Sequence, residues 1–304
     1  MSSRWQRLGK IFCPAGDSAW MMSHAANPVA IKLSNQTFRV FFNTRDSASR
    51  SYVAYLDLDP SFPDKVIAVS PEPLLGPGEL GHFDDSGTSL GCLLQVNDQW
   101  LMYYVGWNLG VTVPFMNSIG LAISADLSKP FKKHSRAPIV DRSDDDPTNI
   151  SYPFVLSEGG IYRMWYGSNI RSGAKTEDMQ HVIKYAESED GIHWTRGKHI
   201  CIDVLDQDDI GACRPWVVKN DDGYEMWYSF RMKNSRYSIG YATSINGLDW
   251  IRKDSSHQFT SKAADWDSQA QCYASIFLHS GNQYMLYCGN DYGRTGFGLA
   301  IRVS

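Results

Sequence analysis

The chain has 304 residues, of which 43% are apolar, 20% are charged and 13% are aromatic, and its formal net charge is −4. This composition is that of a folded globular protein and excludes a disordered chain. The slightly acidic balance offers no basic surface that would neutralise a phosphate backbone, so we expect no nucleic-acid partner.

The N-terminal stretch MSSRWQRLGKIFCPAG lacks an apolar run of signal-peptide length. Nowhere does the sequence hold the roughly 18 consecutive apolar residues that a membrane-spanning helix requires. We therefore expect a soluble, cytoplasmic protein without a membrane partner. Its oligomeric state is left open.

Three short apolar runs recur in the same order and predict one repeated unit. The first runs are residues 28–31, 90–94, 153–156, 215–218 and 275–278. The second runs are rich in aromatic residues and are 40–42, 102–104, 164–166, 226–228 and 285–287. The third runs are 52–55, 119–122, 183–186, 239–242 and 297–300. Turn formers such as Ser157-Glu158-Gly159-Gly160 separate the first run from the second, which is typical of a β-hairpin.

The second runs lie 62, 62, 62 and 59 residues apart, so the unit repeats along the whole chain. Two copies continue as KYAESEDGIHW from Lys184 and GYATSINGLDW from Gly240. We expect the serine and the tryptophan of these phrases to hold a turn before a fourth strand, with glycine supplying positive φ. Short antiparallel strands repeated at such a period predict a β-propeller.

The fold predicted is therefore all-β, a five-bladed β-propeller with four-stranded antiparallel blades in one domain, residues 1–304. The expected blades are residues 20–65, 84–140, 148–203, 209–260 and 267–304. The last copy ends after three strands, so strand 3–12 at the N-terminus is expected to complete it and close the ring, which removes an exposed edge. Prolines at the starts of three of the first runs place those runs innermost, at the edge of each blade.

Residues at the starts of the inner strands are expected to meet in a funnel on the axis. They are His24 and Asn27; Asp84, Asp85 and Ser86; Asn149, Ser151 and Tyr152; Asp209, Cys213 and Arg214; and Asp267, Gln269, Gln271 and Tyr273. A mouth so rich in hydrogen-bonding groups and aromatic rings suits a hydroxylated ligand, a sugar or a glycan. The predicted binding residues are Arg214, Tyr152, Asn27, Asn149, Gln271 and Tyr273.

Arg214 is interpreted as the group that orients an anionic part of the ligand, because a guanidinium binds carboxylates and phosphates in a bidentate way. The alternative is a structural salt bridge to Asp84 or Asp85. Tyr152 and Tyr273 are platforms for the ligand or, alternatively, blade-packing residues.

The segment 106–114 follows a second strand and is longer than a hairpin turn needs. We expect it to fold over the funnel, so that Trp107 and Asn108 contact the ligand.

The stretches HFDDSGTSLG, TNISYPFVLSEGGIYRMWYGSNI, ACRPWVVKNDDGYEMWYSF and YCGNDYGRTGFGLA resemble the five-bladed propeller glycosidases, the group of arabinanases, β-xylosidases and invertases in glycoside hydrolase families 43 and 32. They are more similar still to uncharacterised bacterial propellers of about this length that are associated with polysaccharide genes. The resemblance covers nearly the whole chain and implies a carbohydrate-active, glycoside hydrolase-like protein.

The sequence departs from these glycosidases where their chemistry lies. Hydrolysis of a glycosidic bond normally uses a carboxylic acid and a carboxylate about 5–10 Å apart. In the glycosidases these come from an Asp on the first blade, a helper Asp on a middle blade and a Glu on a later blade. Here Ala26-Asn27-Pro28 carries no acid, and Arg214 and Gln271 stand at the fourth and fifth positions.

Substitute catalytic residues are Asp84 or Asp85 as the base, and Asp209, Asp267 or His24 as the acid. For Asp84 and Asp85 the alternative is capping of a turn, and for His24 it is packing in a loop.

The predicted function is a glycoside hydrolase-like enzyme that acts in the axial funnel on a sugar bearing a negative group. The alternatives are a non-catalytic glycan-binding propeller and a glycosyl-transferring or phosphorolytic enzyme of polysaccharide metabolism. No cofactor and no metal are predicted. The acidic run Asp144–Asp146 is interpreted as a solvated loop, with a calcium site as the alternative.

Overall fold

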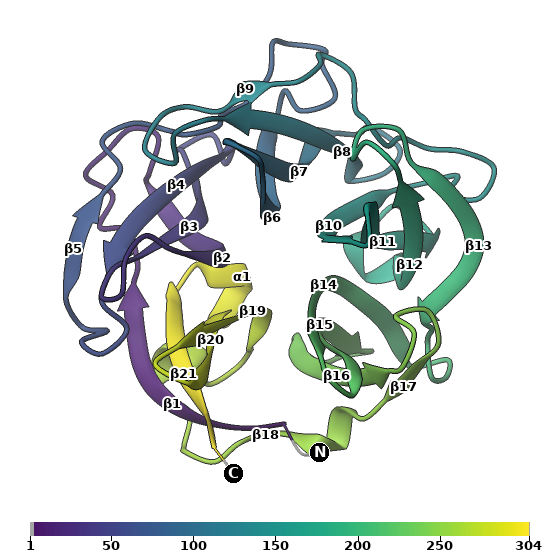
Figure 1. Cartoon of the computed structure of the whole chain (residues 1–304). Helices are drawn as coiled ribbons and strands as arrows, with labels where there is room; N and C mark the ends of the chain where they lie inside the picture. The colour runs from purple at the N-terminus through teal and green to yellow at the C-terminus, as the bar shows by residue number, and fades with distance from the viewer. Residues whose placement is uncertain (1–2, 304) are drawn as a thin grey trace.

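The computed structural model describes residues 3–303, which form an all-β propeller with its strands grouped in antiparallel sets around one axis (Figure 1). The sets are β2 (Ser23–Lys32), β3 (Phe38–Arg45), β4 (Ser51–Leu58) and β5 (Val66–Val69); β6 (Gly87–Val96), β7 (Gln99–Leu109), β8 (Phe115–Ser124) and β9 (Lys132–Lys133); β10 (Ile150–Glu158), β11 (Ile161–Arg171), β12 (Gln180–Ser188) and β13 (Thr195–Ile202); β14 (Asp209–Asn220), β15 (Gly223–Met232), β16 (Ser238–Ser244) and β17 (Trp250–Arg252); and β19 (Cys272–His279), β20 (Asn282–Cys288), β21 (Phe297–Val303), β1 (Ser3–Phe12) and β18 (His257–Phe259). In Figure 1 the strands nearest the axis are the first strands of the sets, β2, β6, β10, β14 and β19.

Neighbouring sets are joined near the axis by single parallel residue pairs. Ser51 on β4 pairs with Gly87 on β6, and His181 on β12 pairs with Gly211 on β14. Gly211 has a φ of 110°, and a Cβ at this position would overlap the carbonyl oxygen of His181. Only glycine therefore allows the two sets to approach so closely here.

The N-terminal strand lies against the end of the chain. β1 pairs antiparallel with β21 and parallel with β18. Trp5 is fully buried against Trp227 at a centroid distance of 6.0 Å, and both indoles donate to Ser3 Oγ, at 2.8 and 2.9 Å. These contacts fasten the N-terminal strand to two adjacent sets.

The serine in the repeated phrase holds a turn, as the sequence predicts. Ser188 Oγ accepts from Gly191 N at 2.8 Å, and Ser244 Oγ accepts from Gly247 N at 2.9 Å. The tryptophan expectation is confirmed in the second copy, where Trp250 Nε1 donates to the Gly247 carbonyl at 3.0 Å.

The same glycine carbonyls accept from aromatic side chains of the neighbouring set. Tyr103 donates to Gly191 O at 3.0 Å, and the Trp165 indole donates to Gly247 O at 2.8 Å. Both aromatic residues are fully buried. The repeated phrase thus connects each of these sets to the preceding one.

Helical structure is confined to short turns. They are η1 (Thr176–Asp178), η2 (Asp254–Ser256), η3 (Asp265–Asp267) and α1 (Asn290–Gly293). Within residues 3–303, no helix has the length and apolar character that a membrane crossing requires. Of these turns, η1 and α1 lie beside the cavities described next.

Candidate functional site

A cavity of about 530 Å³, which we name the axial cavity, lies at the inner ends of the strand sets. Its walls come from the starts of the inner strands and from the ends of the second strands. The expected gathering of side chains distant in sequence is therefore observed for part of the predicted set.

In four of the repeats, the end of the second strand contributes one wall residue. Arg45 on β3, Trp107 on β7, Asn169 on β11 and Arg231 on β15 all line the axial cavity. They are spaced 62 residues apart. Sequence reasoning missed three of the four because it searched only the starts of the inner strands, although the period by itself marks this position.

Both arginines of this ring lack a carboxylate partner. In the described part of the chain, neither Arg45 nor Arg231 forms an ion pair with Asp or Glu. Arg45 lies 6.0 Å over the Trp107 ring, and the Trp107 indole donates to Ser51 Oγ at 2.8 Å. Arg231 donates to the Thr176 carbonyl at 3.5 Å, and its buried Nε has no hydrogen-bond partner. Neither positive charge is therefore neutralised by a direct ion pair, although the Arg231 guanidinium interacts electrostatically with the carboxylate of Glu177.

A bulge recurs in the inner strands and carries residues in the left-handed conformation. Asn27, Tyr152, Arg214 and Tyr273 have φ values of 51°, 45°, 51° and 58°, each at a shift in strand register. A bulge redirects the side chain, and non-glycine residues at positive φ cost on the order of 1–3 kcal/mol. The same strain repeated at equivalent positions is typical of a functional site.

Arg214 does not line the axial cavity but is buried beneath its lining, in contact with the lining residue Asn27, and has 1% of its surface exposed. Its Nε donates to Asn27 Oδ1 and its Nη1 to the Ala274 carbonyl, both at 3.1 Å, and Nη2 has no partner. Burial lowers the pKa of its guanidinium. The alternative salt bridge to Asp84 or Asp85 is not formed, and among residues 3–303 this buried cation has neutral hydrogen-bond partners only.

Tyr152 and Tyr273 line the cavity and lie against each other with a centroid distance of 5.4 Å. The ring centroid of Tyr273 lies 6.3 Å from that of Tyr237 and 6.5 Å from that of Tyr292. Tyr237 and Tyr292 also line the cavity. The four rings form a continuous aromatic surface that runs outward from the axis.

Two histidines face the cavity beside the arginines of its wall. Burial, with the charges of Arg45 and Arg294, lowers the pKa of His24 to about 4. Burial and the charge of Arg231 lower the pKa of His181 to about 4. Both imidazoles are therefore neutral near pH 7 and can accept a hydrogen bond or a proton.

The predicted carboxylates do not line the axial cavity, and no Asp or Glu occurs among its described lining residues. Asp84 instead accepts from Tyr104 at 3.0 Å and pairs with Lys133 at 2.6 Å. Asp267 accepts from Tyr287 at 2.9 Å and pairs with Arg7 at 2.7 Å. These aspartates are buried between strands and brace their sets.

Asp146 and Asp209 are also buried aspartates that pair with cationic side chains. Asp146 is fully buried and pairs with Lys184 at 3.0 Å and Arg196 at 2.9 Å, so its interpretation as part of a solvated loop is wrong. Asp209 pairs with Arg252 at 2.7 Å. Within residues 3–303, no group of three or more His, Cys, Asp or Glu is arranged to hold a metal ion.

Four other predicted residues lie outside the lining of the axial cavity. Asp85 accepts from Gly81 N at 2.9 Å and from Ser86 Oγ at 3.0 Å, which is turn capping. Asn149 is buried and accepts from Asn117 N at 2.8 Å, Gln271 donates to the Asp267 carbonyl, and Asn108 donates to the His82 carbonyl at 3.5 Å. Of the expected covering segment 106–114, residues 106–109 continue β7 and residues 110–114 connect it to β8, and Trp107, Leu109 and Pro114 line the axial cavity. The structure therefore brings His24, Asn27, Trp107, Tyr152 and Tyr273 together around the cavity, with Arg214 beneath it.

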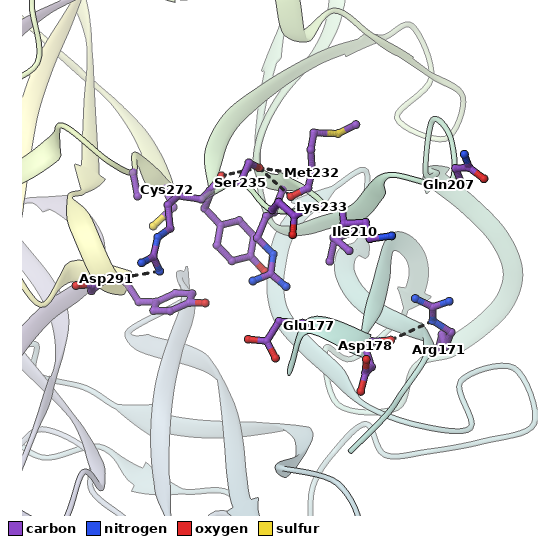
Figure 2. A pocket seen from close by; sticks show the side chains of 16 residues that line it. Arg171, Glu177, Asp178, Gln207, Ile210, Met232, Lys233, Ser235, Cys272 and Asp291 are labelled. Carbon is purple, nitrogen blue, oxygen red and sulfur yellow. Dashed lines mark hydrogen bonds and ion pairs between the residues drawn. The ribbon is translucent and has the colours of Figure 1, made fainter. Parts of the chain in front are cut away.

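A second cavity of about 610 Å³, which we name the side cavity, adjoins the first (Figure 2). Arg231, Tyr237 and Tyr292 line both cavities. Figure 2 shows Lys233, Glu177 and Asp291 around the side cavity, with Arg171 and Asp178 toward one end of it. Asp291 and Tyr292 have φ values of 50° and 59°, which makes this rim another strained segment.

Comparison with known proteins gives one group of sequence relatives and a large group of structural ones. No family model matches the chain. The chain is 43% identical over 297 residues to the uncharacterized protein Rv1502 of Mycobacterium tuberculosis strain ATCC 25618 / H37Rv, with 98% of each protein covered. The uncharacterized protein MT1551 of strain CDC 1551 / Oshkosh is also 43% identical over 297 residues.

Solved structures of carbohydrate-related proteins share the fold. The RGII complex of BT0996 has a TM-score of 0.75 at 16% identity, covering 98% of this protein and 90% of that one. A glycosyl hydrolase from Bacteroides ovatus has a TM-score of 0.73 at 14% identity, covering 99% and 94%. A thermostable family-43 glycoside hydrolase has a TM-score of 0.63 at 17% identity, covering 94% and 90%. The resemblance to the propeller glycosidases is thus confirmed for the fold.

Proposed function

Since this protein belongs to the family of Mycobacterium tuberculosis Rv1502 and shares its fold with glycoside hydrolases, we propose that it is a carbohydrate-active propeller that binds an anionic sugar in the axial cavity. The strand sets support a count of five blades in one domain, with β1 completing the last blade. The structures of glycoside hydrolases on this fold support a carbohydrate as the ligand.

The chemistry of the cavity wall carries the proposal. Arg45 and Arg231 face the cavity without carboxylate partners, and Arg214 adds a buried positive charge below. A guanidinium with free donors binds a carboxylate or phosphate through charge-assisted hydrogen bonds. The aromatic surface that starts at Tyr152 and Tyr273 supplies the apolar contact that a sugar ring requires.

The same wall argues against hydrolysis by two carboxylates. That mechanism needs an acid and a carboxylate on opposite sides of the glycosidic bond, and the described lining of the axial cavity contains neither. Recognition of the sugar is therefore the activity that the geometry supports best. Turnover is the second candidate, and it is favoured by His24, the one predicted catalytic residue that lines the cavity with a neutral imidazole.

A titration of purified protein with matched neutral and acidic monosaccharides tests the proposal. The pairs are the 4-nitrophenyl glycosides of glucose and glucuronate and those of galactose and galacturonate; calorimetry measures binding, and released 4-nitrophenol measures cleavage of the glycosidic bond. We expect the acidic member to bind at least about tenfold more tightly, since a charge-assisted hydrogen bond contributes about 1.5–3 kcal/mol.

Arg45→Gln should remove that preference, whereas Arg142→Gln, a change at an exposed residue outside both cavities, should keep it. Equal affinity for neutral and acidic sugars in the unmodified protein would refute an anionic ligand. Release of a product that stops in His24→Gln would assign turnover to the site.

A further inference from the structure

The wall between the two cavities is made of the same three residues, Arg231, Tyr237 and Tyr292. The aromatic surface described above includes this wall. The ring centroids of Tyr237 and Tyr292 lie 5.8 Å apart, and each ring contacts that of Tyr273. A ligand that lies on Tyr273 in the axial cavity can therefore extend over Tyr237 into the side cavity without leaving an aromatic contact.

Arg231 stands at the passage between the cavities. Its guanidinium lies 5.4 Å over the Tyr237 ring, and its Nε is buried without a hydrogen-bond partner. A buried, unpaired donor on a charged group is costly unless a ligand satisfies it. An anionic group at this point would meet that need.

The side cavity adds further cationic groups, and two of them have no ion pair with a carboxylate in the described part of the chain. Arg171 donates to the Asp178 carbonyl at 3.0 Å, and neither Arg171 nor the exposed Lys233 forms an ion pair with Asp or Glu within residues 3–303. Arg236 lies 3.6 Å from Asp291, which is a long and exposed ion pair (Figure 2). Phosphate groups, with several strong acceptor oxygens, suit such a dispersed set of cations better than a single carboxylate does.

The remaining groups in the side cavity fit hydroxyl groups. Three carboxylate residues, Glu177, Asp178 and Asp291, and the amide residue Gln207 line the side cavity (Figure 2). A carboxylate accepts hydrogen bonds from hydroxyl groups and repels phosphate. The side cavity thus suits a second hydroxylated unit, with the phosphate held toward Arg231 and Lys233.

We propose that the axial and side cavities form one two-part site for a sugar joined through a phosphate ester to a second hydroxylated unit, with the phosphate at Arg231. The inference rests on the proposed function for its first half, the sugar in the axial cavity. A nucleotide sugar and a phosphodiester-linked glycan share this chemistry.

Calorimetric titration with ligands of increasing extent tests the two-part site. The probes are glucose, glucose 1-phosphate, UMP, UDP-glucose and a glucosyl–glycerol phosphodiester, with the galactose and mannose counterparts of each. We expect the two-unit ligands to bind at least about tenfold more tightly than the sugar phosphate, since each charge-assisted contact is worth a factor of about ten or more. Preference for UDP-glucose or for the glycerol diester then identifies the source of the second unit.

Two variants locate the effect. Lys233→Gln alters the side cavity alone, so it should reduce the advantage of two-unit ligands and leave the affinity for acidic monosaccharides unchanged. Arg231→Gln should remove the advantage altogether. Arg142→Gln is the matched control for charge, and unchanged melting temperatures confirm that each variant is folded.

Two-unit ligands that bind no better than glucose 1-phosphate would overturn the inference while leaving the proposed function in place. The same holds if they bind better but do not respond to either variant. If neither sugars nor phosphate esters bind, both proposals fail.

Discussion

The hydroxyl of Tyr104 donates a 3.0 Å hydrogen bond to the buried carboxylate of Asp84. The same bond is present between Tyr166 and Asp146 and between Tyr287 and Asp267, at 2.9 Å in both. In each case the tyrosine ends the aromatic run of a second strand, and a cation completes the group: Lys133 for Asp84, Lys184 and Arg196 for Asp146, and Arg7 for Asp267. In these three strand sets the recurring tyrosine–aspartate pair is an internal brace, and the predicted catalytic residues Asp84 and Asp267 belong to it instead of to the funnel.

We predict that Asp84→Asn destabilises the protein without affecting the ligand site. Loss of the charge leaves Lys133 without its counter-ion in a buried setting, and breaking a buried pair costs about 3–5 kcal/mol. Urea unfolding measures the change in the free energy of unfolding. Asp85→Asn is the matched control and should stay within about 0.5 kcal/mol, since Asp85 only caps a turn. A stable Asp84→Asn protein with no sugar affinity would contradict this assignment.

Acid unfolding should depend on Asp146. Burial would raise the pKa of this carboxyl, but hydrogen bonds from Ser168, Lys184 and Tyr166 and the charge of Lys184 lower it overall below 3.8. A carboxyl with a lowered pKa adds stability above its unfolded pKa, and that stability is lost as the pH falls through the lower folded value. Melting temperatures between pH 2 and 5 should therefore fall steeply in the unmodified protein and less steeply in Asp146→Asn. Parallel curves would show that Asp146 does not contribute.

The two cavity histidines, His24 and His181, should change the stability of the fold at higher pH than Asp146 does. The pKa of His24 and of His181 is lowered from 6.5 to about 4, so the unfolded state takes up these protons first as the pH falls. Stability should then decrease from about pH 6.5 to about pH 4 and be unaffected by these groups outside that range. His181→Gln should flatten the curve between these limits. NMR titration of the imidazoles checks the values directly, and a pKa near 6.5 for His181 would be inconsistent with its burial beside Arg231.

The sequence predicted the propeller because its strands repeat hydrophobic runs and turns, and these signals are local. It also contained the wall residues Arg45, Trp107, Asn169 and Arg231 at a constant spacing of 62, but no local pattern indicates which end of a strand faces the axis. The spacing of 62 residues would therefore have identified more of the site residues than the starts of the inner strands did.

The predicted acids were misplaced for a different reason. The direction of a loop side chain depends on partners that are remote in sequence, such as Arg7 for Asp267 and Lys133 for Asp84. No sequence pattern around Arg7 or Lys133 indicates which aspartate each of them binds. Similarly, the left-handed conformation of Tyr152 and Arg214 arises from strand bulges, which hydrophobic periodicity does not reveal.

The N-terminal strand should be essential for stability. Trp5 is fully buried against Trp227, and truncation of a buried tryptophan costs about 3–5 kcal/mol. We therefore predict that Trp5→Ala lowers the free energy of unfolding by about this amount and increases proteolysis of the protein. Leu8→Ala on the same strand is the control, because Leu8 is 39% exposed. Equal stability of the two variants would show that β1 is not needed to hold the ring together.

Replacement of Arg214 should separate stability from function. The guanidinium is buried with neutral partners only, and its Nη2 is unpaired, so the fold bears the cost of an uncompensated charge. We predict that Arg214→Met leaves the melting temperature unchanged or raises it, because a flexible apolar side chain fills the space without that cost. The same variant should bind acidic sugars about tenfold more weakly, since it removes the positive charge beneath the axial cavity. Calorimetry and thermal unfolding on one preparation measure both effects. A destabilised Arg214→Met protein with unchanged sugar affinity would show that Arg214 serves the fold and not the ligand.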